Sequence, residues 1–357
     1  MIDWTASMDQ SFEFYIVDPN TWKDRIQLRN VKTCTITRDS DSETLGSATI
    51  DVDEPIGECY IRVYLIARQN GYREKRPLGT FLIQTPSTSF DGKSQSYSID
   101  AYTPLIELKE TLPPIGYSLR KGEKIMECAY RLAREQMRAP VVATDSRKEL
   151  FYNFVSNTDD TWLTFLSDLI SNAEHTFDLD ELGRVLFSPR QETAALQPVW
   201  TFNDDNSSIL LPEITIDRDL YGIPNVVEIV YSDPDSKASN AYYYARCVND
   251  DPDSPTSIVN RGREIVYRET DPDLIGDPTE HQIHVYAERR LKELSSLECT
   301  VTYKHGYCPT RVGDCVRLNY SRADLLNVKA RIVSQTITCD LGCQVTEKAV
   351  FTTKLWR

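Results

Sequence analysis

Two histidines and a glutamate near residue 285 have a spacing that suits a metal ion. His281, His284 and Glu288 stand at positions i, i+3 and i+7, so a helix would carry all three on one face. The segment is not the HExxH pattern of zinc proteases, because no Glu follows His281 and the second histidine comes one position early. Polar residues opposite an apolar stripe are the default on an exposed helix, which favours a solvated helix face.

Nine cysteines suggest a second kind of metal site. Cys308, Cys315, Cys339 and Cys343 are close in sequence. Structural zinc sites use ligand pairs about two to four residues apart, and only Cys339 with Cys343 approaches that spacing. The chain has no CxxC pair, and its cysteine count is odd. We therefore predict buried thiols that pack as small hydrophobic groups in strands, in a reducing compartment.

Three other known motifs are incomplete, because each lacks a residue or a spacing that its chemistry requires. The run 39–43 (DSDSE) begins like a calcium loop, but Thr44 stands where that loop needs glycine. The segment 116–123 has one residue too many between its glycines for a phosphate-binding loop, and it lacks the lysine. No GxSxG motif of a serine hydrolase occurs.

Acid–base catalysis has no recognisable pair of groups. The chain has 54 acidic residues, but a catalytic pair needs a cleft and two separated pKa values, and the sequence shows neither. With four histidines, few candidates exist for a general base. We therefore predict no catalytic, cofactor-binding or metal-binding residue, no cofactor, and no enzyme activity.

The first hundred residues have a pattern that is typical of β-strands. Apolar and polar residues alternate, with many β-branched and aromatic side chains. The pairs Asn70-Gly71 and Asp91-Gly92 predict hairpin turns, because these residue types tolerate positive φ. We expect a β-meander that folds as a small barrel or sandwich. Its predicted strands are 10–18, 46–53, 60–67, 78–84 (or 81–90) and 94–102.

The character of the chain changes after the PPIG segment at 113–116. Apolar residues between 122 and 137 recur at helical spacing. A second helix is expected to begin at Asp160 as N-cap, with Trp162 on its apolar stripe. A short hairpin with a turn at Gly183 follows. These elements predict a compact α+β module, in which the aromatic stripe belongs to the core and not to a cofactor pocket.

The last 160 residues return to strands with one interruption. A helix is expected at 279–295, where Thr279 and Gln282 form a capping box and Pro278 stands just ahead. The segment 249–273 is rich in Asp, Pro and Ser, which is typical of a polar loop. We expect a β-domain interrupted by a loop-and-helix insertion. Its strands are predicted at 225–231, 240–247, 298–304, 314–319, 328–338 and 343–354.

Composition limits the class of protein. The 357 residues are 40% hydrophobic, enough for packed cores in about two to four domains. The net charge is −14, which argues against nucleic-acid binding through the overall field. No run approaches the roughly 18 apolar residues of a membrane helix, and the N-terminus lacks the features of a signal peptide.

Several segments, taken in order, resemble the baseplate or tail hub proteins of tailed phages and of related contractile injection particles (tailocins). Each segment is weakly specific, and the ordered set covers nearly the whole chain. The segments are YSIDAY (97–102), TDDTWLTFL (158–166), FDLD (177–180), GRVLF (183–187), IPNVVEI (223–229), SPTS (254–257) with Gly262-Arg263, RVGDCVRL (311–318) and VKARIVSQTIT (328–338).

The resemblance implies a fold of α+β class that is mainly β. Two tube-like β-barrel domains have an α+β domain between them, and the second barrel carries a small helix-containing insertion. The implied boundaries are 1–105 for the first tube-like domain, 106–194 for the α+β domain, 195–235 with 297–357 for the split second tube-like domain, and 236–296 for the insertion.

The resemblance also implies a structural function. Three copies would form a ring with a central channel, adapting a hexameric tail tube to a threefold central spike or tail tip. Implied partners are tail tube or tube-initiator proteins, the spike or tail-tip protein, the tape-measure protein and baseplate wedge proteins. The protein would reside in a virion or tailocin particle assembled in the host bacterial cytoplasm. Because the chain stops at Arg357, any lytic activity is expected in a partner.

Two alternatives remain open from the sequence. One is a tail-tip peptidoglycan hydrolase that uses two carboxylates. The other is a carbohydrate- or receptor-binding tail module, since 19 Tyr and five Trp can supply stacking surfaces, although Tyr is equally common in strands and interfaces. The negative charge has two interpretations as well: an acidic channel that does not bind DNA, or ordinary solubility.

Overall fold

The computed structural model describes residues 2–90, 92, 95–205, 208–232, 242–272 and 279–355. Asp91 of the predicted second hairpin turn, the start of the strand predicted at 240–247, Pro278 and Arg357 lie outside these residues. Contacts divide the chain into two compact units, Met1–Ile214 with Thr302–Ala349 and Thr215–Val301 with Val350–Arg357. The chain therefore passes from one unit to the other three times.

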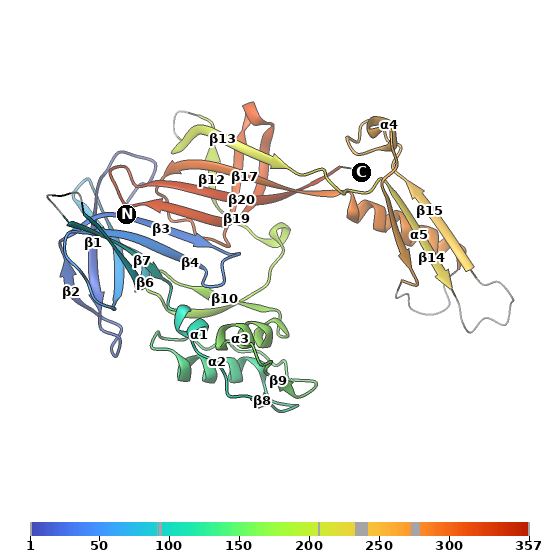
Figure 1. Ribbon diagram of the computed structural model, residues 1–357. Coiled ribbons are helices and arrows are strands. Elements are labelled where there is room, and N and C mark those ends of the chain that lie inside the picture. The colour runs from blue at the N-terminus through green and yellow to red at the C-terminus, as the bar shows by residue number, and fades with distance from the viewer. Residues whose placement is uncertain are drawn as a thin grey trace. The chain divides into compact units, whose positions relative to one another are not determined.

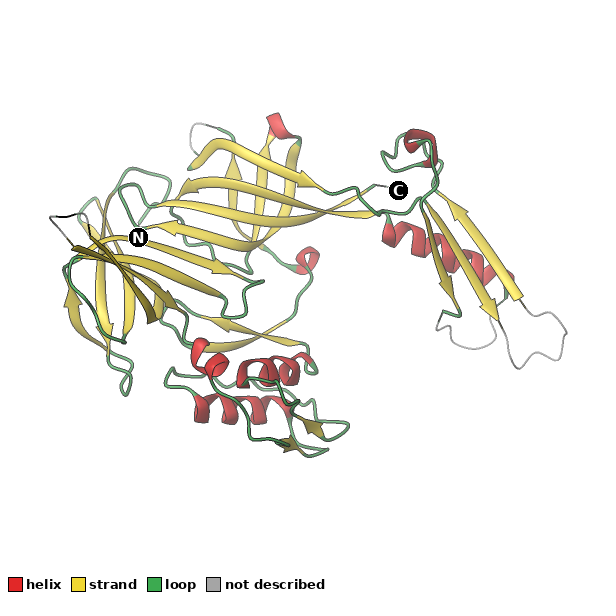
Figure 2. Ribbon diagram, viewed as in Figure 1, coloured by secondary structure: helices red, strands yellow, loops and turns green. Residues whose placement is uncertain are grey.

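Strands dominate the chain, and helices are few (Figure 2). Among the described residues, thirteen strands form one sheet in the order β13-β17-β20-β19-β3-β4-β7-β6-β5-β1-β2, with β12 beside β18 and β18 beside β19. The predicted class, α+β and mainly β, is confirmed. This strand order is an open path, and no pairing among the described residues closes it into a barrel.

Strands β1 to β7, here called the first strand region, follow one another along the chain (Figure 1). Asn70 and Gly71 have φ of 50° and 81°, which confirms the predicted hairpin turn between β5 and β6. Strands β2 and β3 are additional to the predicted ones. The seven strands are β1 (Asp9–Val17), β2 (Asp24–Leu28), β3 (Val31–Asp39), β4 (Gly46–Val52), β5 (Tyr60–Gln69), β6 (Tyr72–Phe90) and β7 (Gln95–Tyr102).

A helical module follows, in which α2 and α3 lie side by side (Figure 1) and share one apolar cluster. Its two predicted helices are confirmed, but the N-cap of α3 is Thr161 and not Asp160. The Thr161 hydroxyl accepts from the backbone N of Thr164 at 3.1 Å, whereas the Asp160 carboxylate accepts from the backbone N of Asn157. The elements are α1 (Ile106–Glu110), β8 (Ser118–Leu119), α2 (Ile125–Gln136), β9 (Phe154–Val155), α3 (Trp162–Ser171), β10 (His175–Leu179) and β11 (Val185–Pro189).

The closing strands complete the large sheet. Antiparallel pairing from Thr35 opposite Thr338 to Asp39 opposite Ser334 joins β3 to β19; we call this pairing the β3–β19 seam. It makes one sheet of strands that stand far apart in the sequence. The elements are the 3-10 turn Thr193–Ala195, β12 (Pro198–Asn203), β13 (Leu210–Arg218), β17 (Ser296–Gly306), β18 (Cys315–Tyr320), the 3-10 turn Ser321–Ala323, β19 (Leu325–Thr338) and β20 (Gln344–Lys354).

The second unit contains a three-stranded sheet with its own core. Ile283, Ala287 and Leu291 of α5 pack on β14 and β15, and the predicted Thr279–Gln282 capping box is confirmed. The prediction of a polar loop across 249–273 is wrong in part, because β16 pairs in parallel with β14. The elements are β14 (Val226–Ser232), β15 (Tyr242–Val248), α4 (Ile258–Arg261), β16 (Val266–Thr270) and α5 (Glu280–Leu294).

No helix of the described residues has the length and apolar character to cross a membrane.

Candidate functional site

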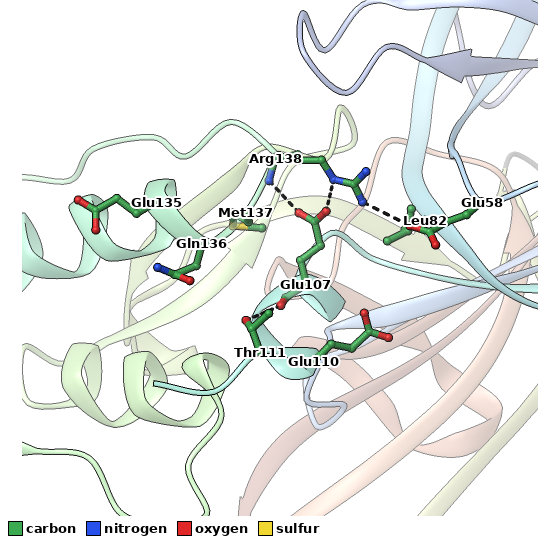
Figure 3. A pocket seen from close by; sticks show the side chains of 9 residues that line it. All are labelled: Glu58, Leu82, Glu107, Glu110, Thr111, Glu135, Gln136, Met137 and Arg138. Atoms are coloured by element: carbon green, nitrogen blue, oxygen red, sulfur yellow. Dashed lines mark hydrogen bonds and ion pairs between the residues drawn. The ribbon is translucent and has the colours of Figure 1, made fainter. Parts of the chain in front are cut away.

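A surface pocket of 380 Å³ lies where the first strand region meets the helical module (Figure 3). Its centre is Arg138, just beyond α2. The Arg138 backbone N donates to Glu107 Oε2 at 2.8 Å, its Nε donates to Glu107 Oε1, and its Nη2 lies 3.7 Å from Glu58 Oε1. The lining residues are Glu58, Leu82, Glu107, Glu110, Thr111, Glu135, Gln136, Met137 and Arg138.

The pocket is built around an ion pair that connects neighbouring elements of the fold. Arg138 neutralises Glu107, and the only hydroxyl in the lining, on Thr111, donates to the Glu107 backbone oxygen at 2.8 Å. The Arg138 guanidinium also lies 5.2 Å from the ring centre of the buried Tyr60 in β5, a cation–π contact. The lining therefore offers no nucleophile beside a base, and Arg138 holds α1, α2 and β5 together.

A second cluster surrounds Glu347 of β20 inside the closing strands. Its carboxylate, fully buried, accepts from Tyr303 Oη at 2.6 Å, from Thr310 Oγ1 at 2.7 Å and from Gln335 Nε2 at 2.7 Å. His305 Nε2 lies 3.4 Å from Glu347 Oε2. A buried carboxylate needs such partners, because an isolated charge in the core would be strongly destabilising.

These partners also decide which groups are charged. Burial alone would lower the pKa of His305, but contacts with Cys308 and Glu347 raise it to about 10. Burial alone would raise the pKa of Glu347, but His305, Tyr303 and Thr310 lower it. The pair is therefore an imidazolium facing a carboxylate at neutral pH.

The order thiol, imidazole, carboxylate is that of a cysteine nucleophile with its base and orienting acid. Cys308 Sγ lies 3.8 Å from His305 Nδ1, and Glu347 stands on the other ring nitrogen. All three side chains are fully buried, so no substrate reaches the thiol in this fold. The cluster is accordingly a charged part of the core.

Polar contacts hold the turn between β10 and β11 against the strands. Leu182 O accepts from Arg62 Nη2 at 3.0 Å and from Trp22 Nε1 at 2.7 Å. Arg311 Nη2 donates to Leu179 O at 2.6 Å, and its Nε pairs with Glu181 at 2.8 Å. Arg62 lies in β5, Trp22 lies between β1 and β2, and Arg311 precedes β18, so this turn contacts three other parts of the first unit.

Gly183 in that turn leaves no room for a side chain, which gives a testable prediction. Its φ is +75°, and a Cβ there would meet Thr80 Cβ at 2.7 Å and Trp22 Cζ2 at 3.2 Å. We expect Gly183→Ala to lower the free energy of unfolding by about 2–3 kcal/mol, through backbone strain and overlap together. Chemical denaturation measures the loss.

The matched control is Gly122→Ala. Gly122 has φ of +86°, and apart from Gly122 and its two chain neighbours no atom of the described residues lies within 4 Å of the place that a Cβ would take. This variant therefore reports backbone strain alone, about 1 kcal/mol. Equal losses for the two variants would contradict the close packing of the turn on Thr80 and Trp22.

The structure does not assemble the candidate metal ligands of the sequence. His281 and His284 are exposed on α5, and Glu288 pairs with Lys292 at 3.1 Å. Within the described ranges, no three His, Cys, Asp or Glu side chains gather to hold a metal ion. All nine cysteines are free, and the prediction that they are buried is confirmed for eight of them, Cys59 being half-buried. The prediction that they lie in strands is wrong in part, because Cys128 lies in α2 and only Cys34, Cys247, Cys299 and Cys315 lie in strands.

Sequence analysis missed Arg62, His305 and Glu347, which stand at the centres of the clusters above. A signal was present for two of them: Arg62 is a charged residue inside the apolar run YIRVYLIA, and Glu347 stands between Val345 and Ala349 on the apolar side of an alternating pattern. A charge at such a position must find a buried partner. Which partner it finds depends on strands that are distant in sequence.

Comparison with known proteins gives a result only at the level of structure. No family model and no curated protein matches the sequence. The fold is similar to the tail protein from Neisseria meningitidis MC58, with 12% identity, 96% of each chain covered and a TM-score of 0.60. It is also similar to the 43 kDa tail protein of prophage MuSo2 from Shewanella oneidensis, with 11% identity, 96% of this chain and 98% of that chain covered, and a TM-score of 0.59.

A third similar structure is longer than this chain. A chain of the half-lidded Francisella PdpA–VgrG complex matches with 8% identity and a TM-score of 0.54, over 97% of this chain and 58% of that one. Identities this low show a shared fold. The resemblance predicted from the sequence is confirmed at that level.

Proposed function

We propose that this chain, which shares the fold of phage tail proteins along nearly its whole length, is a structural hub of a tail baseplate. Three copies form a ring with a central channel, which adapts a hexameric tail tube to a threefold spike or tail tip. The observation that carries the proposal is the match over 96% of both chains to the Neisseria tail protein. A match of that extent covers the strands, the helical module and the second unit together.

The proposed division of labour follows the boundaries expected from the sequence. Residues 1–105 and the split segment 195–235 with 297–357 are the two tube-like domains. Residues 106–194 and the insertion 236–296 lie outside the ring. The proposed partners are the tail tube or tube-initiator, the spike or tail-tip protein, the tape-measure protein and wedge proteins, within a virion or tailocin particle assembled in the host cytoplasm.

Open strand edges support assembly into a ring. Strand β2 pairs only with β1 among the described strands, and Ile26 on β2 is about half exposed. Unpaired edges with apolar side chains seek partners. Pairing between neighbouring subunits would complete the barrels that one chain leaves open.

The side-chain clusters support a role without catalysis. The pocket around Arg138 is ion-paired, and the cysteine–histidine–glutamate cluster is buried. In our proposal the chain is not an enzyme, and cell-wall cleavage belongs to a partner. No feature of the described residues specifically favours the hydrolase or the glycan-binding alternative.

The mass of the assembly tests the proposal. Native mass spectrometry and light scattering of the purified chain should give three times 40.9 kDa, with a central opening in electron micrographs. Ile26→Lys on the β2 edge should weaken the trimer, whereas Val259→Lys at an exposed site on α4 should leave it unchanged. A chain that stays monomeric beside tube and spike proteins, or that degrades peptidoglycan on a zymogram, would overturn the proposal.

A further inference from the structure

The β3–β19 seam brings together two cysteines from distant parts of the chain. Cys34 lies in β3, and Cys339 directly follows β19. The pair Thr35–Thr338 is the last of the seam, and one step further the backbone N of Cys339 donates to the oxygen of Cys34 at 2.9 Å. The two cysteines therefore stand opposite each other, with side chains on the same face of the sheet.

This placement suits a disulfide bond. Opposite residues of a hydrogen-bonded antiparallel pair have Cα atoms about 5.5 Å apart, inside the range of about 4.4–6.8 Å that disulfides span. Both side chains are buried, with exposed fractions of 2% for Cys34 and 9% for Cys339. The thiol–thiol contact, with burial second, raises the pKa of Cys339 well above its ordinary value.

We propose that Cys34 and Cys339 are a dithiol–disulfide site, which a low-molecular-weight disulfide such as oxidised glutathione converts to one intramolecular bond across the seam. The Cys339 thiolate, the more exposed of the two at 9%, attacks a sulfur of the oxidant and releases one reduced thiol. The other protein thiolate then attacks the mixed disulfide and releases the second. The protein loses two protons and two electrons, and the oxidant gains them as two thiols.

Two physical consequences follow. The raised pKa makes the exchange slow at neutral pH, because only the thiolate attacks, and faster in alkaline solution. In a reducing cytoplasm the site remains a dithiol, and it closes only after transfer to an oxidising medium. The chemistry does not depend on the proposed hub function, since it rests on the register of one strand pair.

Cys343 is the competing partner. It is fully buried, lies four residues beyond Cys339, and its backbone N donates to Asp340 O at 2.9 Å in the turn before β20. Opposite placement across the seam favours Cys34 over Cys343. The experiment must therefore distinguish the two possible bonds.

The test is peptide mapping of the intact folded chain after oxidation. The protein is incubated with oxidised glutathione at mildly alkaline pH, its remaining thiols are alkylated, and it is digested with trypsin. We expect one cross-linked species that joins Thr33–Arg38 to Ile332–Lys348, with fragment ions that place the bond at Cys339. Seven of the nine thiols should remain free, and reductant should restore all nine.

Two variants provide the controls. Cys34→Ser should abolish the cross-link, and Cys343→Ser should retain it. Separate glutathione adducts on Cys34 and Cys339, a Cys339–Cys343 bond, or full retention of both thiols would each overturn the proposal. Because the cross-link is read in the unsubstituted protein, the result does not depend on whether a variant folds.

Discussion

Replacing Glu347 by alanine should lower the free energy of unfolding of the first unit by about 3–5 kcal/mol. The substitution leaves the His305 imidazolium without its carboxylate and the Tyr303 and Thr310 hydroxyls without their acceptor, all inside the core. Gln335 Nε2 loses its bond to Glu347 and keeps the longer one to the Thr310 backbone oxygen at 3.2 Å. Unpaired buried groups of this kind carry their full desolvation penalty. Urea denaturation, read by hydrogen exchange in β19 and β20, measures the loss.

The size of this loss should depend on pH. Because the folded pKa of Glu347 is lowered, its stabilising effect is present above its ordinary pKa of 4.5 and disappears as the pH falls through the folded value. Because the folded pKa of His305 is raised to about 10, its effect is complete below 6.5 and disappears as the pH rises towards 10. The difference between the wild type and Glu347→Ala should therefore be largest between pH 4.5 and 6.5.

Two further variants separate charge from packing. Glu347→Gln keeps one oxygen, which can accept from one of the Tyr303 and Thr310 hydroxyls, but removes the charge, so it should lose less stability than alanine. Glu298→Ala, at an exposed position in β17, should change stability by less than about 0.5 kcal/mol. If Glu347→Ala matched this surface control, the buried ion pair would not contribute to folding.

Trp162→Ala should destabilise the helical module by about 3–5 kcal/mol. Trp162 is 4% exposed, and its ring packs edge-on against Tyr117 at 5.0 Å and Phe165 at 5.8 Å between ring centres. Removing the indole leaves a cavity that these rings cannot fill without moving. Hydrogen exchange in α2 and α3 should accelerate, while exchange in β4 and β5 changes less.

Phe151→Ala is the matched control for that prediction, since Phe151 belongs to the same module and is 83% exposed. Its removal should leave exchange in α2 and α3 at the wild-type rate. Wild-type exchange in the Trp162→Ala variant as well would mean that the aromatic stripe is not the core of this module.

Local patterns predicted many of the helices and strands but not the way in which they combine. The helix at α2, the capping box of α5 and the Asn70-Gly71 turn follow from short-range rules that act within a few residues. Strand β2 could not be predicted, because an end strand with mostly exposed side chains shows no alternation of buried and exposed positions. The N-cap moved by one residue because Thr161 and Asp160 are both good caps, and the Thr164 hydroxyl completes the box only with Thr161.

The candidate sites depended on contacts that no local pattern contains. The Glu347 cluster combines β17, β19 and β20, and the hydrogen bond from Arg62 to Leu182 O joins β5 to the turn after β10. Sequence alone places a charge in an apolar strand, but the partner is chosen by the register of strands that are distant in the chain. The same holds for Cys34 and Cys339, which are separated by almost the entire chain and become opposite neighbours only through the seam.

The seam has a consequence for how the protein is made. One edge of β3 is covered by β4, and the other is covered only when β19 has left the ribosome, nearly 300 residues later. At roughly 5–20 residues per second, that delay is on the order of 15–60 s. During translation the nascent chain therefore presents a bare strand edge, which must be shielded from other growing chains.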